Sequence, residues 1–420
     1  MAAVDSEREP DREVPDMKVT VQLADRSLEL DDDPFPETDG ASFGHPPVRT
    51  AFAAAHVVMR SEYAEVQHAP EAPGTPDEIA EHIDLAATAE FRRHLDRCGF
   101  GVAEAMDTAQ RFELGWVGAR RLIEMTGGLG LAHGFCAGIG TDQLGRPPRD
   151  VEELIHAVGE QAAVVRDNGG LPVLLPNVAL LRFGLDADGF VAVHERLLDA
   201  IDGPLILHWL GPMFVPELDG YFPGDSFERI LALDPARVRG CKLSLLDADH
   251  EVGVRRRIAP RDQVVFTGDD FHFGELILGG DPADPERAAP PVDRVGELAG
   301  RPLALGDFSH ALLGILDGIA DPFGRALTRL SGGDVAGYRE IATACEALGQ
   351  HVFAAPTSRY KAGLAFLAWL NGHQDNFMLV NHAERLRDRE HYLRCAELAS
   401  AAGAIANAGL AAERLREFEG

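Results

Sequence analysis

The chain has 420 residues, of which 45% are apolar and 25% are charged. This composition is enough for one large core or two ordinary ones, and it excludes whole-chain disorder, collagen and small disulfide scaffolds. Asp and Glu total 68 against 39 Lys and Arg, a formal net charge of −29. That charge argues against nucleic acid and anionic membrane surfaces as partners. No apolar run approaches the roughly 18–20 residues that span a bilayer.

The N-terminal segment, 1–45, is rich in proline and acidic residues, so we expect a tail and an arm there, with one short strand at 19–23. Its first 16 residues have no apolar stretch typical of a signal peptide, and a cytoplasmic location is therefore expected. The five cysteines are scattered and form no C-x-x-C pair. Buried free thiols are expected rather than disulfides or a thiolate zinc site.

Between residues 46 and 320, short apolar runs alternate with helical patterns. Asp84 and Asp150 are candidate helix N-caps, and Gly169 and Gly203 are candidate helix stops. Near-continuous apolar strands alternating with amphipathic helices indicate a parallel sheet, and eight such units predict an α/β fold, a (β/α)8 TIM barrel. The alternative, a doubly wound open sheet, would need a Gly-rich phosphate turn after its first strand, and the sequence has none. The eight candidate strands are 48–58, 100–106, 131–139, 171–176, 204–210, 238–245, 263–267 and 302–308.

Beyond residue 320 no strand pattern remains. The segments 334–348, 357–370 and 382–417 have helical patterns. We expect residues 321–420 to form a C-terminal helical subdomain packed on the barrel.

Polar residues recur at the ends of successive candidate strands, where the chemistry of such barrels gathers. Solvated surface charges would instead be spread along the helices, so this pattern predicts a functional pocket. Trp209 has two open interpretations, simple packing or a flat wall for a sugar ring. The candidate substrate-binding residues are Glu104, Asp107, Thr141, Asp142, Asn177, Trp209, Ser244, Asp247, Asp270 and His310.

Lys242 is the strongest single candidate for a catalytic role. The chain has only three lysines, Lys18, Lys242 and Lys361, and uses arginine for nearly every other positive charge. Lys242 lies in an apolar strand pattern, where desolvation favours the neutral amine. A neutral amine can attack a carbonyl and form a Schiff base, which arginine cannot do. A buried salt bridge to Glu104 or to a nearby Asp is the alternative.

His208 directly follows an apolar strand and is the second catalytic candidate, because histidine can relay protons near neutral pH. A core histidine bonded to the backbone is the alternative. His208, His310, Glu104 and Asp270 could also ligate a divalent metal, although no fixed metal-binding spacing is present.

The order of these residues resembles that of the dihydrodipicolinate synthase and N-acetylneuraminate lyase superfamily of class I aldolases. Gly240-Cys-Lys-Leu-Ser244 is similar to the segment that carries the imine-forming lysine on strand 6 of that family. Ala137-Gly-Ile-Gly-Thr-Asp142 and Gly268-Asp-Asp270 resemble its segments at strands 3 and 7, and the helical tail resembles its C-terminal helices. The resemblance implies a barrel lyase or aldolase, with Lys242 as the imine lysine, that assembles as a homo-oligomer, a dimer or a tetramer.

Two departures from the family bear on the substrate. The stretch 102–108 lacks the paired hydroxyls that hold a keto-acid carboxylate in the family, and Glu104 would repel a carboxylate. His208 stands at or beside the place of the family's catalytic tyrosine. We therefore expect a polyhydroxylated keto-sugar rather than pyruvate as the small-molecule substrate, with no cofactor. A metal-dependent sugar isomerase or epimerase and a non-catalytic sugar-binding barrel are the alternatives.

Overall fold

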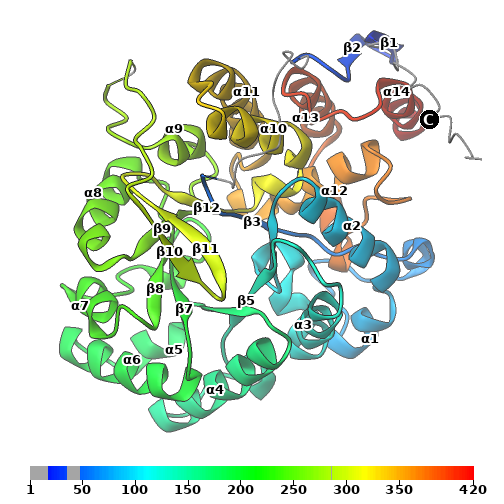
Figure 1. Ribbon diagram of the computed structural model, residues 1–420. Coiled ribbons are helices and arrows are strands. Elements are labelled where there is room, and N and C mark those ends of the chain that lie inside the picture. Colours follow the sequence, from blue (N-terminus) through cyan, green and yellow to red (C-terminus); the bar gives the residue numbers. More distant parts are fainter. Residues whose placement is uncertain (1–17, 36–47, 285) are drawn as a thin grey trace, which may run out of the picture.

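The structure is a computed structural model that describes residues 18–35, 48–284 and 286–420. Eight parallel strands close into a barrel in chain order, because the last strand pairs with both its predecessor and the first (Figure 1). This confirms the predicted (β/α)8 barrel. The barrel strands are β3 (Ala51–Ala54), β4 (Gly101–Glu104), β5 (Phe135–Ile139), β6 (Leu171–Leu174), β7 (Leu205–Leu210), β8 (Val238–Ser244), β9 (Val264–Thr267) and β12 (His310–Leu313).

Helices connect the strands and cover the outside of the barrel (Figure 1). Asp84 and Asp150 cap α2 and α4 as predicted, because each carboxylate accepts backbone N–H bonds from the first helical turn. The helices of this layer are α1 (Pro76–Glu81), α2 (Leu85–Arg97), α3 (Arg111–Gly127), α4 (Val151–Asp167), α5 (Val178–Arg182), α6 (Ala187–Ile201), α7 (Ser226–Leu233), α8 (Ala248–Ile258) and α9 (Phe273–Leu278).

The predicted eighth strand, 302–308, is wrong. These residues mostly belong to β11 (Arg301–Leu305), which pairs antiparallel with β10 (Arg294–Leu298). Three leucines of this hairpin, Leu298, Leu303 and Leu305, join the apolar cluster inside the barrel. The hairpin therefore covers the end of the barrel at which the strands begin, and this packing explains its apolar pattern (Figure 1).

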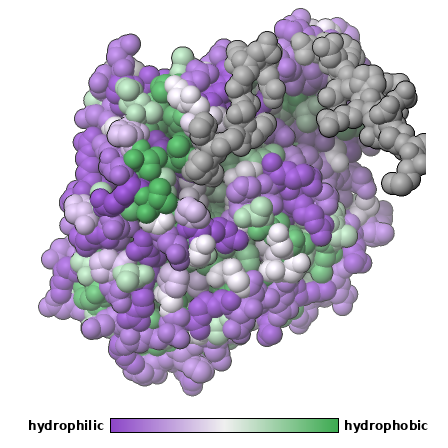
Figure 2. Space-filling model, viewed as in Figure 1, coloured by the Kyte–Doolittle hydropathy of each residue, from purple (hydrophilic) through white to green (hydrophobic). Residues whose placement is uncertain are grey.

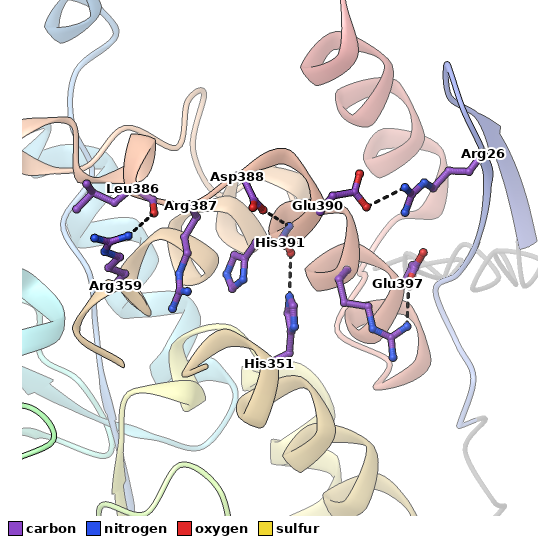
Figure 3. A pocket seen from close by; sticks show the side chains of 10 residues that line it. Arg26, His351, Arg359, Leu386, Arg387, Asp388, Glu390, His391 and Glu397 are labelled. Carbon is purple, nitrogen blue, oxygen red and sulfur yellow. Dashed lines mark hydrogen bonds and ion pairs between the residues drawn. The ribbon is translucent and has the colours of Figure 1, made fainter. Parts of the chain in front are cut away.

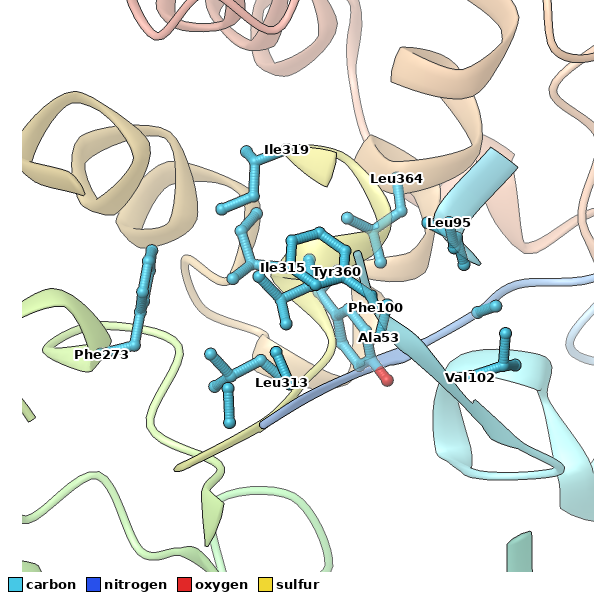
Figure 4. Packing of buried hydrophobic residues seen from close by; sticks show 14 of the residues in the cluster. Ala53, Leu95, Phe100, Val102, Phe273, Leu313, Ile315, Ile319, Tyr360 and Leu364 are labelled. Atoms are coloured by element: carbon cyan, nitrogen blue, oxygen red, sulfur yellow. The ribbon is translucent and has the colours of Figure 1, made fainter. Parts of the chain in front are cut away.

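The hydrophobic core has two layers. One fills the barrel and includes Phe52, Ala103, Ile206 and Phe266. The other lies between the barrel and its helices, and Figure 4 shows part of it around Phe100. Since successive residues of a strand point to opposite sides, each strand supplies both layers in alternation.

The chain ends in five helices, α10 (Ala320–Ser331), α11 (Val335–Val352), α12 (Lys361–Leu370), α13 (Arg389–Ala401) and α14 (Ala408–Glu419). The helical pattern predicted at 382–417 corresponds mainly to two helices, α13 and α14, which are separated near Gly403, where φ is +69°. An N-terminal hairpin, β1 (Lys18–Gln22) and β2 (Ser27–Asp31), packs on these two helices (Figure 1). Its Asp31 N–H donates to Ser400 Oγ at 2.8 Å.

Hydrophilic residues predominate on the face shown in Figure 2, in keeping with the net charge of −29. Among the residues that the structure describes, no helix is both long enough and apolar enough to cross a bilayer. Of the tail and arm predicted at 1–45, residues 1–17 and 36–45 lie outside the described residues, and the division of the chain at residues 45 and 320 stays a prediction.

Candidate active site

A cavity of about 650 Å³ opens where the barrel strands end. It is lined by residues from the ends of strands β4 to β9 and from the loops that follow them. Eight of the residues singled out from the sequence line it, namely Asp107, Thr141, Asp142, Asn177, His208, Lys242, Ser244 and Asp270. Four others, Glu104, Trp209, Asp247 and His310, do not.

Lys242 lies on β8 beside His208 of β7 and Phe266 of β9 in the strand register. Phe266 is inside the barrel, so the lysine side chain also points inward, toward the cavity. Burial lowers its pKa, and the negative charge of Asp270 opposes this shift. Among the described residues, no hydrogen bond or ion pair holds its amine. The side chain therefore has the freedom and the environment of a nucleophilic amine.

Gly268, just after β9, makes room for this lysine. A Cβ at that position would lie 2.8 Å from Lys242 Cε and 2.2 Å from Ser244 Oγ. Its backbone N–H donates to Leu243 O at 2.7 Å, which fixes the two strand ends together. The position of the Lys242 side chain therefore depends on there being no side chain at Gly268.

His208 shares the inward face of β7 with Ile206. Its Nε2 lies 3.2 Å from Ser244 Oγ, and its buried Nδ1 has no partner among the described residues. Burial, reinforced by the nearby charge of Lys242, holds its pKa well below the usual range. These surroundings favour the neutral ring, which has one N–H donor and one acceptor nitrogen.

Asp270 is a buried carboxyl beside the lysine. Burial raises its pKa to about 7, and the Ile315 N–H, which donates to Oδ1 at 2.9 Å, opposes the shift. A carboxyl with that pKa can give and take a proton near neutrality, as general acid–base catalysis needs. Asp269, next to it in the chain, is turned away and holds His272 Nδ1 at 2.9 Å instead.

Tyr360 also lines the cavity, and sequence reasoning missed it. It comes from the loop before α12 and lies 2.9 Å from Thr108 Oγ1, and its hydroxyl donates to Asp107 Oδ2 at 3.0 Å. Lys361 pairs with the same Asp107 at 2.9 Å. The scarcity of lysine that singled out Lys242 applied equally to Lys361, and it was the one signal pointing to this segment.

Three polar residues at the ends of β5 and β6 bond to protein groups. Asn177 donates to Thr141 Oγ1 at 2.9 Å and accepts the first N–H bond of α5. Asp142 Oδ1 accepts from Arg111 at 2.9 Å and from Gln161 at 2.9 Å. Of these side-chain oxygens, Asp142 Oδ2 alone is buried and has no hydrogen-bond partner among the described residues.

Glu104 points away from the cavity, between β4 and the helices. It accepts two bonds from Arg92, each 3.0 Å long, and one from Thr126 Oγ1 at 2.7 Å. Arg92 lowers the pKa of this carboxyl although burial opposes the shift. Because the neighbouring Ala103 takes the inward position, Glu104 cannot reach a substrate and is left out of the proposed site.

The other three residues outside the cavity have structural contacts. The Trp209 ring packs against Phe222 and Phe227, and Asp247 caps α8 through the His250 N–H at 2.9 Å. His310 begins β12 at the opposite end of the barrel, where Nδ1 accepts the Thr50 N–H at 2.8 Å and Nε2 donates to Ala304 O at 2.9 Å. Its placement follows from the shifted eighth strand.

The metal site considered from the sequence needs His208, Asp270, Glu104 and His310 together, and the fold separates the last two from the cavity. Within the described residues, two other groups could hold an ion, and neither lies in this cavity. They are His351 with His391 and Cys395, and His94 with Cys98 and Asp321.

A second cavity, of about 560 Å³, lies among α11, α13 and the preceding loop (Figure 3). Its arginines are committed to protein groups. Arg26 pairs with Glu390 at 2.8 Å, Arg394 pairs with Glu397 at 2.8 Å, and Arg359 donates to Leu386 O at 3.1 Å. This arrangement is that of a surface ion-pair network.

The model of a family described as "Protein of unknown function (DUF993)" matches residues 23–419. The chain belongs to this family. No curated protein matches the sequence. The DUF993 chain is, however, similar in fold to solved dihydrodipicolinate synthases and N-acetylneuraminate lyases, which confirms the resemblance noted from the sequence.

Three solved structures illustrate the likeness. A monomeric dihydrodipicolinate synthase variant has a TM-score of 0.59 at 12% identity, covering 85% of this chain and 97% of that one. The Acinetobacter baumannii dihydrodipicolinate synthase complexed with pyruvate has a TM-score of 0.56 at 13% identity, covering 85% and 100%. The Mycoplasma synoviae N-acetylneuraminate lyase has a TM-score of 0.53 at 11% identity, covering 86% and 99%. At these identities the likeness shows the fold alone.

Proposed function

We propose that the protein is a lyase or aldolase that forms a Schiff base between Lys242 and a carbonyl substrate. The observation that carries the proposal is the inward-facing, unpaired Lys242 in a large cavity at the strand ends of the barrel. The fold likeness to synthases and lyases, one of them solved with pyruvate, supports it.

In the proposed reaction, the neutral amine of Lys242 adds to the substrate carbonyl carbon. The carbinolamine then loses water, and Asp270 supplies the proton that lets the hydroxyl leave. In a C–C cleavage, the iminium accepts the electron pair of the neighbouring C–C bond, and the hydroxyl on the released carbon loses its proton and becomes a carbonyl. In a C–O cleavage, the iminium accepts the pair of the adjacent C–H bond, and the resulting enamine expels the oxygen leaving group with its own pair from the next carbon. His208, bonded to Ser244, takes or returns the proton at the adjacent carbon. Hydrolysis of the imine releases product and restores the free amine.

The keto-sugar substrate stays a prediction with weakened support. It rested on acidic strand ends and on Trp209 as a wall for a sugar ring, but Glu104 and Trp209 both lie outside the cavity. The same geometry places two of the four ligands proposed for a metal-dependent isomerase, Glu104 and His310, outside the cavity. A homo-oligomer, as a dimer or tetramer, and a cytoplasmic location also stay predictions.

Borohydride trapping tests the proposal. The protein is incubated with a panel of aldehydes and ketones, reduced, and digested, and the lysine peptides are weighed by mass spectrometry. We expect a stable adduct on the peptide containing Lys242, and Lys242→Met should abolish it.

Because the chain has only three lysines, the matched controls Lys18→Met and Lys361→Met complete the set. Both should keep the adduct on Lys242. A panel that labels no lysine would refute the imine, and turnover that EDTA stops while borohydride has no effect would favour the metal-dependent alternative. Binding of a sugar without turnover or adduct would favour the non-catalytic barrel.

A further inference from the structure

The cavity changes chemical character between its floor and its mouth. The floor holds Lys242, His208 and Ser244, which lie on the strands, and Asp270, which lies just after β9. The loops that follow the strands contribute mainly apolar side chains to the walls. They include Met106, Pro147, Leu175, Phe214, Val215 and Leu218. A ligand whose carbonyl reaches Lys242 must run its remaining atoms along this apolar wall.

The polar groups among these loops are mostly engaged already. Asp107 is held by Tyr360 and Lys361, and Asn177 is held by Thr141 and the start of α5. A chain of hydroxyls would therefore leave water and find few free partners. Leaving a hydroxyl buried without a hydrogen bond is costly, so the walls select against a polyol.

Phe112 is the clearest sign of an apolar ligand. It lines the cavity and is 63% exposed, so apolar ring surface is left there for a ligand to cover. The chain holds it there through the start of α3, where Gln110 has a positive φ of 52° and Gly115 one of 62°. A Cβ at Gly115 would lie 2.8 Å from Pro76 Cβ, so this kinked start of the helix requires glycine.

Resting on the proposed imine chemistry, we propose that the substrate is a carbonyl compound with an apolar aryl or alkyl tail that covers Phe112. The carbonyl binds at Lys242, and the tail packs along Phe214, Val215 and Leu218 toward the mouth. One methylene in an apolar pocket changes the discrimination between substrates by about 10- to 200-fold. An aryl tail should therefore be preferred over a polyol of similar length by at least about tenfold.

The test compares three 2-keto acids that share one reacting group. Pyruvate carries no tail, 4-phenyl-2-oxobutanoate carries an aryl tail, and a 3-deoxy-2-keto-hexonate carries a polyol tail. The rate of borohydride-trapped adduct on Lys242 is measured for each at the same concentration. We expect the aryl compound to react at least about ten times faster than the other two.

A pair of matched variants locates the tail. Phe112→Ser and Val295→Ser each replace an exposed large apolar residue, 63% and 67% exposed, but Val295 is on the β10–β11 hairpin away from the cavity. Phe112→Ser should remove most of the aryl preference, measured as the ratio of the aryl to the polyol rate, while Val295→Ser should leave that ratio unchanged.

The outcomes separate the two proposals. A polyol that reacts as fast as the aryl compound, or faster, would overturn the apolar tail and leave the imine standing. An aryl preference that survives Phe112→Ser unchanged would overturn the placement of the tail. If none of the three compounds labels Lys242, direct binding decides. Calorimetry should still detect binding of 4-phenyl-2-butanol, which lacks a carbonyl, because its aryl tail packs on the apolar wall. Binding of a hexitol instead would refute the proposal of an apolar tail.

Discussion

Replacing Gly268 with alanine should displace the proposed nucleophile while leaving its chemistry intact. The added methyl carbon would meet Ser244 Oγ at 2.2 Å, Leu243 O at 2.8 Å and Lys242 Cε at 2.8 Å, whereas ordinary contacts begin at 3.4 Å. The Leu243 carbonyl is backbone and is bonded to the N–H of Gly268 itself, so it has little freedom to retreat. The side chains of Ser244 and Lys242 must therefore move, by about 1 Å.

Two magnitudes follow from this displacement. Overpacking a close-packed interior costs about 1–3 kcal/mol of unfolding free energy. A misplacement of about 1 Å at a reacting centre costs on the order of 100-fold in rate. We therefore expect Gly268→Ala to fold, to lose about 1–3 kcal/mol in urea titrations, and to trap a carbonyl substrate on Lys242 about 100 times more slowly.

Gly332→Ala is the matched control. It lies at the end of α10, and its added Cβ would meet nothing closer than Arg329 O at 3.5 Å. Both its stability and its trapping rate should stay near those of the parent protein. If Gly268→Ala trapped the substrate at the parental rate, the position of Lys242 would not depend on this contact, and the geometry drawn for the site would be refuted.

Three further predictions concern residues outside the cavity. Arg92→Leu should cost about 3–5 kcal/mol of unfolding free energy, because it leaves the buried Glu104 carboxylate without its partner. The double variant Arg92→Leu with Glu104→Leu should recover most of this loss in urea titrations. A Glu104 that binds substrate would not show that recovery. His310→Gln should lower stability by about 1–3 kcal/mol and leave Lys242 trapping within about twofold, since the residue lies at the far end of the barrel; a large loss of trapping would contradict that placement. Burial raises the pKa of Glu251 to about 8, so its contribution to stability is present below its usual pKa of 4.5 and is lost as the pH rises through 8. Glu251→Gln should therefore gain stability relative to the parent between pH 5 and 9, and a constant difference across that range would refute the shifted pKa.

The barrel could be predicted from the sequence because its signal is local. Apolar runs alternate with capped helices, and Asp84 and Asp150 mark two helix starts that the structure contains. The eighth strand could not be placed, because an apolar run that covers the end of a barrel has the same pattern as one that belongs to it. Residues 302–305 and 311–313 are both apolar, and only the strand pairing distinguishes them.

For the candidate site too, some residues could be predicted from the sequence and others could not. Lys242 and His208 were found because strand ends and a rare residue type are visible in one sequence. The direction of Glu104 was not visible, because it depends on Arg92, an earlier residue on another element. Tyr360 reaches the cavity from the C-terminal helices, and no local pattern connects that segment to the barrel.

Lys242 and Asp270 influence each other's pKa, although no hydrogen bond or ion pair among the described residues joins them. Burial disfavours the charged form of both groups, lowering the pKa of the amine and raising that of the carboxyl, while each charge in turn stabilises the other. Burial thus favours a neutral amine on Lys242 and a protonated carboxyl on Asp270. An imine needs both halves of that state, a free amine to attack and a nearby acid to protonate the departing hydroxyl. The barrel supplies the amine on β8 and the carboxyl in the turn after the neighbouring strand β9.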